Sequence, residues 1–167
     1  QTCIMNNINR LLIANRGEIA VRIIRTCNQL GIETVLVASE ADLDALPARL
    51  ADNVVNIGPP PSQKSYLDIE AVIQASRQFT VDAIHPGYGF LSENADLAIA
   101  CEKADIVFIG PTISQLHAIG DKLRARANAV AASLPVVPGG SVTEAETAVS
   151  LAQEIGYPVL IKAVSGG

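Results

Sequence analysis

The feature that most constrains the fold is a regular alternation of short apolar runs with amphipathic segments over about the first 110 residues. Apolar runs of strand length lie at residues 10–14, 34–38, 53–57, 81–85 and 106–109. Helical periodicity occurs between them at residues 18–30, 68–78 and 95–103. Such alternation is typical of a parallel sheet covered on both faces, because each crossover lays a helix on the sheet. We therefore expect an α/β fold with a Rossmann-like parallel sheet over residues 1–111.

The first helical segment shows this pattern most clearly. Its predicted buried face consists of Ala20, Ile23, Ile24, Cys27 and Leu30. This spacing of three and four residues predicts one apolar face of a helix. Asn15 and Glu18 have the spacing of a capping box, and Gly31 is expected to end the helix. The pairs Thr112–Gln115 and Thr143–Glu146 repeat the capping-box spacing before later helices.

Residues 112–167 follow a different pattern. An alanine-rich helix is expected at 123–132, another helix reaches Ile155, and a final apolar strand is expected at 158–163. Two helices and one strand have too few partners to enclose a core of their own. We therefore interpret residues 112–167 as linker helices and the opening of a second domain.

Composition excludes several classes of protein. The net charge is −5 and no basic cluster appears, which argues against a nucleic-acid or membrane-surface module. No apolar run approaches the ~20 residues of a membrane span. The three cysteines are widely spaced, which fits neither a disulfide framework nor a zinc site. We expect a cytoplasmic, reducing compartment, with Cys27 as a small core residue.

The turn Asn15-Arg16-Gly17-Glu18 follows the first predicted strand, at the edge of an open α/β sheet where ligands usually bind. The G-x-G-x-x-G pattern of dinucleotide sites is missing here, so we favour a sheet that does not hold NAD. For this turn alone, simple capping and pairing by Arg16 and Glu18 explains the residues better than catalysis.

A second turn, His85 to Asn94, follows another predicted strand and faces the same edge. Two glycines flank Tyr88 and allow close approach of the backbone to a ligand. Glu93 could accept hydrogen bonds or act as a base. The structural alternative is a satisfied strand-end His85 and a packed Tyr88. Taken as a ten-residue constellation, the segment favours a functional site.

Two lysines suggest an anionic ligand. Lys162 interrupts an apolar run just before Gly166 and Gly167, and an unpaired ammonium is costly to bury. Lys122 follows Gly120-Asp121 and opens a helix, where anions are favoured. Two lysines that converge on a phosphate explain both positions. The alternative is a pair of solvated side chains.

These segments together resemble biotin carboxylases. The motifs that carry the resemblance, in order, are Asn15 to Ala20, Lys64 to Leu67, His85 to Asn94, Phe108 to Pro111, Gly120 to Lys122, Val137 to Gly139 and Tyr157 to Ala163. The similarity runs from Asn9 to Gly167 and includes the biotin carboxylase subunit of acetyl-CoA carboxylase, which serves fatty acid biosynthesis. It also includes the matching domains of propionyl-CoA, methylcrotonyl-CoA, pyruvate and urea carboxylases. The implied fold is a Rossmann-like pre-ATP-grasp domain followed by the opening segment of an ATP-grasp domain.

The resemblance implies a ligase that uses ATP and bicarbonate, through carboxyphosphate, to carboxylate biotin on a carrier protein. Mg2+ or Mn2+ would bridge the phosphates. Lys122 and Lys162 match ATP-contacting lysines, and Gly166 and Gly167 match the start of a glycine-rich lid. Tyr88 and Glu93 match the loop that borders the biotin and bicarbonate region. The family's metal ligands and general base match no position in this chain, so we expect the 167 residues alone to be inactive.

The implied partners are a biotin carboxyl carrier protein or domain, a carboxyltransferase component and a second copy of the chain. Gln29 stands where many bacterial relatives carry a glutamate that pairs with the arginine matching Arg25 across the dimer interface, which predicts weaker pairing here. Two alternatives stay open: another ATP-grasp ligase of the carbamoyl-phosphate synthetase kind, and a non-catalytic interaction or assembly module.

Overall fold

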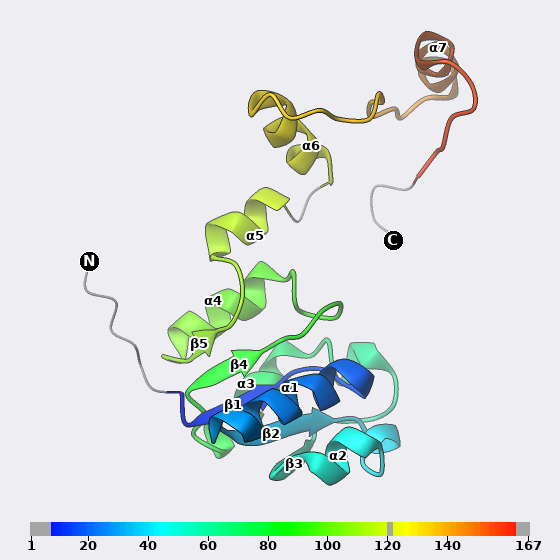
Figure 1. The fold of residues 1–167 in the computed structure, drawn as a ribbon. Coiled ribbons are helices and arrows are strands. Elements are labelled where there is room, and N and C mark those ends of the chain that lie inside the picture. Colours follow the sequence, from blue (N-terminus) through cyan, green and yellow to red (C-terminus); the bar gives the residue numbers. More distant parts are fainter. Residues whose placement is uncertain (1–7, 120–121, 163–167) are drawn as a thin grey trace, which may run out of the picture. The chain divides into compact units, whose positions relative to one another are not determined.

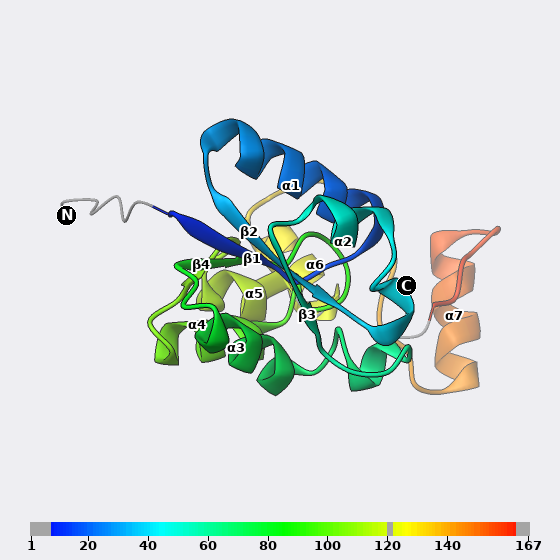
Figure 2. The same cartoon turned by 90° about the horizontal axis from the view of Figure 1, so that it is seen from below.

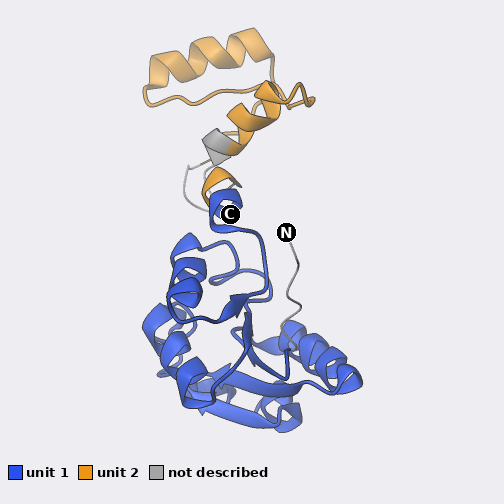
Figure 3. Ribbon diagram, turned by 90° about the vertical axis from the view of Figure 1, so that its left-hand side faces the viewer, with its two compact units in different colours: residues 1–116 blue, residues 117–167 orange. Residues whose placement is uncertain are grey.

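The computed structural model describes residues 8–119 and 122–162, which divide between two compact units with a boundary after Leu116 (Figure 3). The strands are β1 (Arg10–Ile13), β2 (Glu33–Ala38), β3 (Asn53–Asn56), β4 (Ala83–His85) and β5 (Val107–Phe108). The α-helices are α1 (Gly17–Leu30), α2 (Leu46–Leu50), α3 (Ile69–Gln78), α4 (Ala95–Lys103), α5 (Ile113–Ile119), α6 (Lys122–Ala131) and α7 (Ala145–Ile155) (Figure 1).

The first unit contains a five-stranded sheet in the order β3-β2-β1-β4-β5. Every neighbouring pair of strands is parallel, and Leu12 at the centre is in register with Val35 on one side and Ile84 on the other. The strand order reverses direction between β1 and β4, as in doubly wound nucleotide-binding folds. The predicted α/β class and Rossmann-like sheet are confirmed.

Helices cover both faces of this sheet, α1 and α2 on one face and α3 and α4 on the other (Figure 2). Alternate residues along β1 serve the two layers, because successive strand side chains point to opposite faces. Leu11 and Ile13 pack with α1, whereas Leu12 and Ala14 pack with α3 and α4. Each fully buried aliphatic side chain contributes about 1.5–3 kcal/mol to folding.

The predicted buried face of α1 is correct for four of its five residues. Ala20, Ile23, Ile24 and Cys27 are buried, but Leu30 is 68% exposed. Leu30 is the last residue of the helix, and Gly31 in the left-handed conformation ends the helix there, just before β2 begins at Glu33. Leu30 therefore lies at the exposed end of the helix and outside the core.

The capping boxes have mixed outcomes. Thr112 and Gln115 form theirs, with Gln115 Oε1 accepting from the Thr112 N–H and Thr112 Oγ1 accepting from the Gln115 N–H. The prediction was wrong for α1, whose N-cap is Arg16 and has no side-chain capping bond. It was also wrong for α7, whose N-cap is Glu144, again without a side-chain bond. Asn15 does not cap α1, because its side chain donates hydrogen bonds to the loop after β4 instead.

Three short elements have no counterpart in the sequence prediction: α2 and the 3-10 turns at Glu40–Asp42 and Ser62–Lys64. They are too short to show a clear hydrophobic period. They nevertheless place Asp42 and Tyr66 beside the loops at the carboxyl edge of the sheet.

The second unit is held by local contacts in its described part. Arg126 of α6 donates from Nη1 and Nη2 to the carbonyl oxygens of Val137 and Gly139, at 2.6 and 3.1 Å, and so fixes the extended segment after the helix. The strand predicted at 158–163 does not form over its described residues, 158–162, and Leu160 and Ile161 are 78% and 80% exposed. A strand requires a hydrogen-bonded neighbour, and the described part of this unit contains none.

Candidate functional site at the carboxyl edge of the sheet

The candidate site lies where the strand order reverses, at the carboxyl ends of β1 and β4. The chain leaves β1 toward α1 on one face and leaves β4 toward α4 on the other face. Diverging connections of this kind create the crevice in which open α/β sheets bind ligands. The two turns singled out in the sequence, Asn15 to Glu18 and His85 to Asn94, therefore start from adjacent strands.

Asn15 joins these two turns. Its Nδ2 donates to the carbonyl oxygens of Pro86 and Tyr88, at 2.7 and 2.8 Å, and its Oδ1 accepts from the Arg16 N–H at 2.9 Å. Only an NH2 group can satisfy two carbonyl acceptors at once, so the orientation of the amide is fixed by its partners. Asn15 is 3% exposed and fully hydrogen-bonded.

The backbone of the second turn is shaped to admit Asn15. Gly87 has φ +66°, and a Cβ at this position would lie 2.8 Å from Asn15 Nδ2. A side chain is thus excluded both by the left-handed conformation and by space. Gly87 N–H also donates to His85 Nδ1 at 3.0 Å, which keeps that imidazole nitrogen unprotonated. Burial lowers the pKa of His85, in agreement with a neutral ring.

Tyr88 projects from this turn and is 60% exposed. Its hydroxyl donates to Oε1 of Glu18 in the first turn of α1, and this hydrogen bond raises the pKa of Tyr88. Glu93 is exposed and makes no hydrogen bond or ion pair with the described residues. Both predicted residues therefore belong to the same turn, with Tyr88 held at its hydroxyl and Glu93 free toward solvent.

Arg16 lies against two aromatic rings beside this turn. Its guanidinium carbon is 5.5 Å from the ring centroids of both Tyr66 and Phe90, which stack with 5.0 Å between their centroids. Arg16 Nη1 also pairs with Asp42 Oδ2 at 3.5 Å. The interpretation that Arg16 simply pairs is thereby supported, with cation–π contact added to the ion pair.

Asp42 is the half-buried centre of a polar network that sequence reasoning missed. Its Oδ2 accepts from Ser39 Oγ and from the Tyr66 hydroxyl, each at 2.7 Å, and the Tyr66 hydroxyl accepts from the Ser39 N–H at 3.0 Å. Burial alone would raise the pKa of Asp42, but the Ser39 and Tyr66 hydrogen bonds and the Arg16 charge hold it below its usual value. Burial, together with Asp42, raises the pKa of Tyr66 to about 12. The signal in the sequence was the Lys64–Leu67 motif, which resembled the family but had no assigned role.

The predicted phosphate-side residues lie in the second unit. Lys122 is the first residue of α6, although its side chain lies outside the described residues. Lys162 is exposed at the end of the described chain, and Gly166 and Gly167 lie outside it. Convergence of the two lysines therefore stays a prediction.

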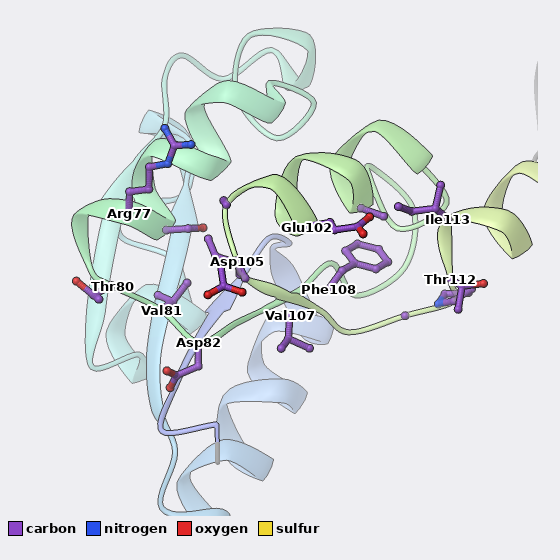
Figure 4. Close-up of a pocket in the computed structure, with 16 residues that line it drawn as sticks. Arg77, Thr80, Val81, Asp82, Glu102, Asp105, Val107, Phe108, Thr112 and Ile113 are labelled. Carbon is purple, nitrogen blue, oxygen red and sulfur yellow. The ribbon is translucent and has the colours of Figure 1, made fainter. Parts of the chain in front are cut away.

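A large groove lies elsewhere on the first unit. It has a volume of about 1020 Å3 and runs from the amino ends of β4 and β5 along β5 (Figure 4). Its charged lining residues are Arg77, Asp82, Glu102 and Asp105. Asp82 Oδ2 accepts hydrogen bonds from the N–H groups of Asn9 and Arg10, at 2.7 and 2.9 Å. None of the predicted site residues lines this groove, so its size alone does not make it the candidate site.

The described residues contain no group of three or more His, Cys, Asp or Glu side chains that could hold a metal ion. None of their helices is long and apolar enough to cross a membrane.

Fold and site together define a Rossmann-like unit with a candidate ligand site at its switch point, and sequence comparison identifies the family to which this unit belongs. The profile described as biotin carboxylase, N-terminal domain, matches residues 7–116, and that of the carbamoyl-phosphate synthase L chain, ATP binding domain, matches residues 121–167. The chain belongs to the biotin carboxylase family. The resemblance stated from the motifs is confirmed, including the start of an ATP-grasp domain after the Rossmann-like sheet.

Individual relatives agree. The chain is 54% identical to biotin carboxylase 1 of Bacillus subtilis over 162 residues, which cover 96% of the chain and 36% of that protein. It is 47% identical to the human mitochondrial propionyl-CoA carboxylase alpha chain, covering 95% of the chain and 22% of the relative.

A solved structure gives the same assignment. The biotin carboxylase domain dimer of Hydrogenobacter thermophilus 2-oxoglutarate carboxylase, in complex with MgADP, ADP and bicarbonate, matches with a TM-score of 0.88 and 43% identity, covering 96% of the chain and 36% of that structure. The chain thus spans about a third of the length of the bacterial biotin carboxylases that it matches.

Proposed function

We propose that this chain supplies the Rossmann-like domain and the first ATP-grasp segment of a biotin carboxylase, a ligase that carboxylates carrier-bound biotin with ATP and bicarbonate. Family membership across residues 7–116 is the observation that carries this proposal. The bound MgADP and bicarbonate of the Hydrogenobacter thermophilus relative support the same substrates here.

The ATP side is assigned to the second unit. Lys122 and Lys162 would contact the phosphates, and Gly166 and Gly167 would begin the lid over them. Lys162 is exposed, so its ammonium group stays hydrated until a ligand binds. A long, flexible lysine side chain of this kind is suited to contact a phosphate. ATP would supply the phosphoryl group that activates bicarbonate. Lid closure would exclude water from the labile carboxyphosphate.

The biotin side is assigned to the turn after β4. Tyr88 presents an exposed ring that is fixed at its backbone and at its hydroxyl, and Glu93 lies exposed in the same turn. A fixed aromatic ring is suited to contact the flat ureido ring of biotin, and a free carboxylate could accept a hydrogen bond from a substrate. No described residue is assigned to Mg2+ or Mn2+, because none belongs to a cluster of metal-ligating side chains.

The partners and location are also proposals. We propose a biotin carboxyl carrier protein or domain and a carboxyltransferase component as partners in the cytoplasm. A homodimer is supported by the dimeric Hydrogenobacter thermophilus relative, and α1 exposes Arg25 and Gln29 on its outer surface. Acetyl-CoA, with a role in fatty acid biosynthesis, is one acyl acceptor to propose, but the relatives also include carboxylases named for propionyl-CoA and 2-oxoglutarate.

The test is transfer of radiolabel from bicarbonate to biotin by the native enzyme. We expect label on biotin only when ATP and a divalent cation are both present, since ATP must activate bicarbonate first. ATP cleavage that needs bicarbonate but transfers no label to biotin would instead favour the carbamoyl-phosphate synthetase kind of ligase, whose ATP-binding profile matches residues 121–167. Absence of any bicarbonate-dependent ATP cleavage would overturn both.

A further inference from the structure

Tyr88 is held at two separate points by the turn that follows β1. Asn15 Nδ2 donates to the Tyr88 carbonyl at 2.8 Å, and Glu18 Oε1 accepts from the Tyr88 hydroxyl. The first contact fixes the backbone and the second fixes the far end of the side chain. A side chain held at both ends keeps its rotamer although 60% of its surface is exposed.

We propose that Asn15 and Glu18 are positioning residues for the carboxylation of biotin, which act by presenting the Tyr88 ring in one orientation. This inference rests on the proposed function, in which Tyr88 contacts biotin. Neither residue is proposed to touch the substrate. Each acts through Tyr88, and their effect is greatest on the binding of biotin.

The chemistry of the two contacts makes them separable. Glu18→Gln keeps a carbonyl oxygen that can accept from the Tyr88 hydroxyl, whereas Glu18→Ala removes the acceptor. Asn15→Asp keeps the shape of the side chain but replaces both donors with an oxygen that faces two carbonyls. Glu18 is exposed, so its variants remove little packing, whereas Asn15 is buried and its variants also affect stability.

The experiment measures KM for free biotin and KM for ATP in the native enzyme carrying Glu18→Ala, Glu18→Gln, Tyr88→Phe and the double variant Glu18→Ala with Tyr88→Phe. Loss of one hydrogen bond of ordinary strength corresponds to a rise of about two- to tenfold in KM for biotin. We expect this rise for Glu18→Ala with KM for ATP unchanged, and recovery of most of the loss in Glu18→Gln. In the Tyr88→Phe background, Glu18→Ala has no further effect.

Glu70→Ala is the matched control. Glu70 is also an exposed carboxylate in the first turn of a helix, α3, but its side chain accepts from Gln74 instead of a tyrosine. The substitution Glu70→Ala therefore removes the same kind of interaction between a carboxylate and a helix N-terminus, but it does not release Tyr88. KM for biotin is expected to stay at the native value.

The outcomes are distinct. Additive effects of Glu18→Ala and Tyr88→Phe would show that Glu18 does not act through the Tyr88 hydroxyl, which overturns the positioning role and leaves the proposed function intact. An unchanged KM for biotin in Tyr88→Phe would overturn the biotin-side role of the hydroxyl and the positioning role of Glu18 together. Asn15→Asp, with folding checked by circular dichroism, is expected to raise KM for biotin and not KM for ATP, and an equal rise in both would overturn its role.

Discussion

At the residue scale, two tyrosines at the same edge of the sheet have opposite roles. Tyr66 is 1% exposed and its hydroxyl joins the Ser39 N–H to Asp42, whereas Tyr88 is 60% exposed and its hydroxyl contacts only Glu18 among the described residues. The first therefore stabilises the fold and the second is available to a substrate. Neither position could be told from the other by residue type.

This difference predicts unequal costs for one substitution. Tyr66→Phe leaves the buried Ser39 N–H without its acceptor, and an unsatisfied buried group costs about 1–3 kcal/mol in the free energy of unfolding. Tyr88→Phe breaks an exposed bond and should cost less than about 0.5 kcal/mol. Urea denaturation followed by circular dichroism measures both. Equal costs would contradict the assignment of Tyr66 to a structural network.

A second prediction concerns His85, whose pKa is lowered by burial and whose Nδ1 accepts from the Gly87 N–H. Below an ordinary histidine pKa of about 6.5 the unfolded chain takes up the proton more readily than the folded chain, so stability falls as pH drops through that value toward the folded-state pKa. His85→Asn, whose Oδ1 can accept the same hydrogen bond, should remove this part of the pH dependence. Urea midpoints at pH 7.5 and 5.5 measure it.

The chain contains one other histidine, which gives a control. His117 is exposed in α5 and lies outside the turn after β4, so His117→Asn is the matched control variant. If His117→Asn and not His85→Asn flattened the dependence, the account of the turn after β4 would be wrong.

At the scale of the elements, the pattern of the sequence predicts long elements well and contacts between loops poorly. The five strands and the helices α1, α3 and α4 follow from hydrophobic periods that extend over whole elements. The cap of α1 could not be predicted in this way, because Asn15 has two possible sets of partners. The local capping-box spacing competes with acceptors 71 and 73 residues away, and the distant carbonyls prevail.

The turn after β4 predicts a difference between its two glycines. Gly87 and Gly89 have φ of +66° and +64°, so an alanine at either position adopts an unfavourable left-handed conformation that costs about 1–2 kcal/mol. Only at Gly87 does the added Cβ meet Asn15 Nδ2, at 2.8 Å, whereas at Gly89 nothing lies within 4 Å. Gly87→Ala should therefore destabilise the chain by about 1–3 kcal/mol more than Gly89→Ala. Thermal denaturation of the two variants tests this, and equal destabilisation would argue against the Asn15 contact.

At the scale of the whole molecule, the two units differ in how much core they possess. Nearly all buried apolar residues of the described chain belong to the first unit, while Ala152 is the one such residue of the second unit. The hydrophobic fraction of 49% suits a sizeable core but does not show how unevenly that core is divided between the two units. The strand expected at 158–163 was wrong over its described part for the same reason, since an apolar run forms a strand only beside a partner.

This division predicts unequal protection of backbone amides. Amides of β1, β2 and β4 should exchange only on global unfolding, because both faces of these strands are covered. Amides of α6 and α7 should exchange faster by local opening. Hydrogen–deuterium exchange of the 167-residue chain measures this, and uniform protection across both units would contradict it.

In the proposed biotin carboxylase, Tyr88 contacts biotin, and Lys122 and Lys162 contact the phosphates of ATP. The most direct measurement compares KM for biotin and KM for ATP in the native enzyme carrying Tyr88→Ala or Lys162→Gln, with Lys103→Gln at the exposed end of α4 as control. Tyr88→Ala should raise only KM for biotin, and Lys162→Gln only KM for ATP, each by about tenfold or more, since tenfold corresponds to ~1.4 kcal/mol of lost binding. Lys103→Gln should change neither. The claim is contradicted if Tyr88→Ala leaves KM for biotin unchanged or if both variants alter the two constants alike.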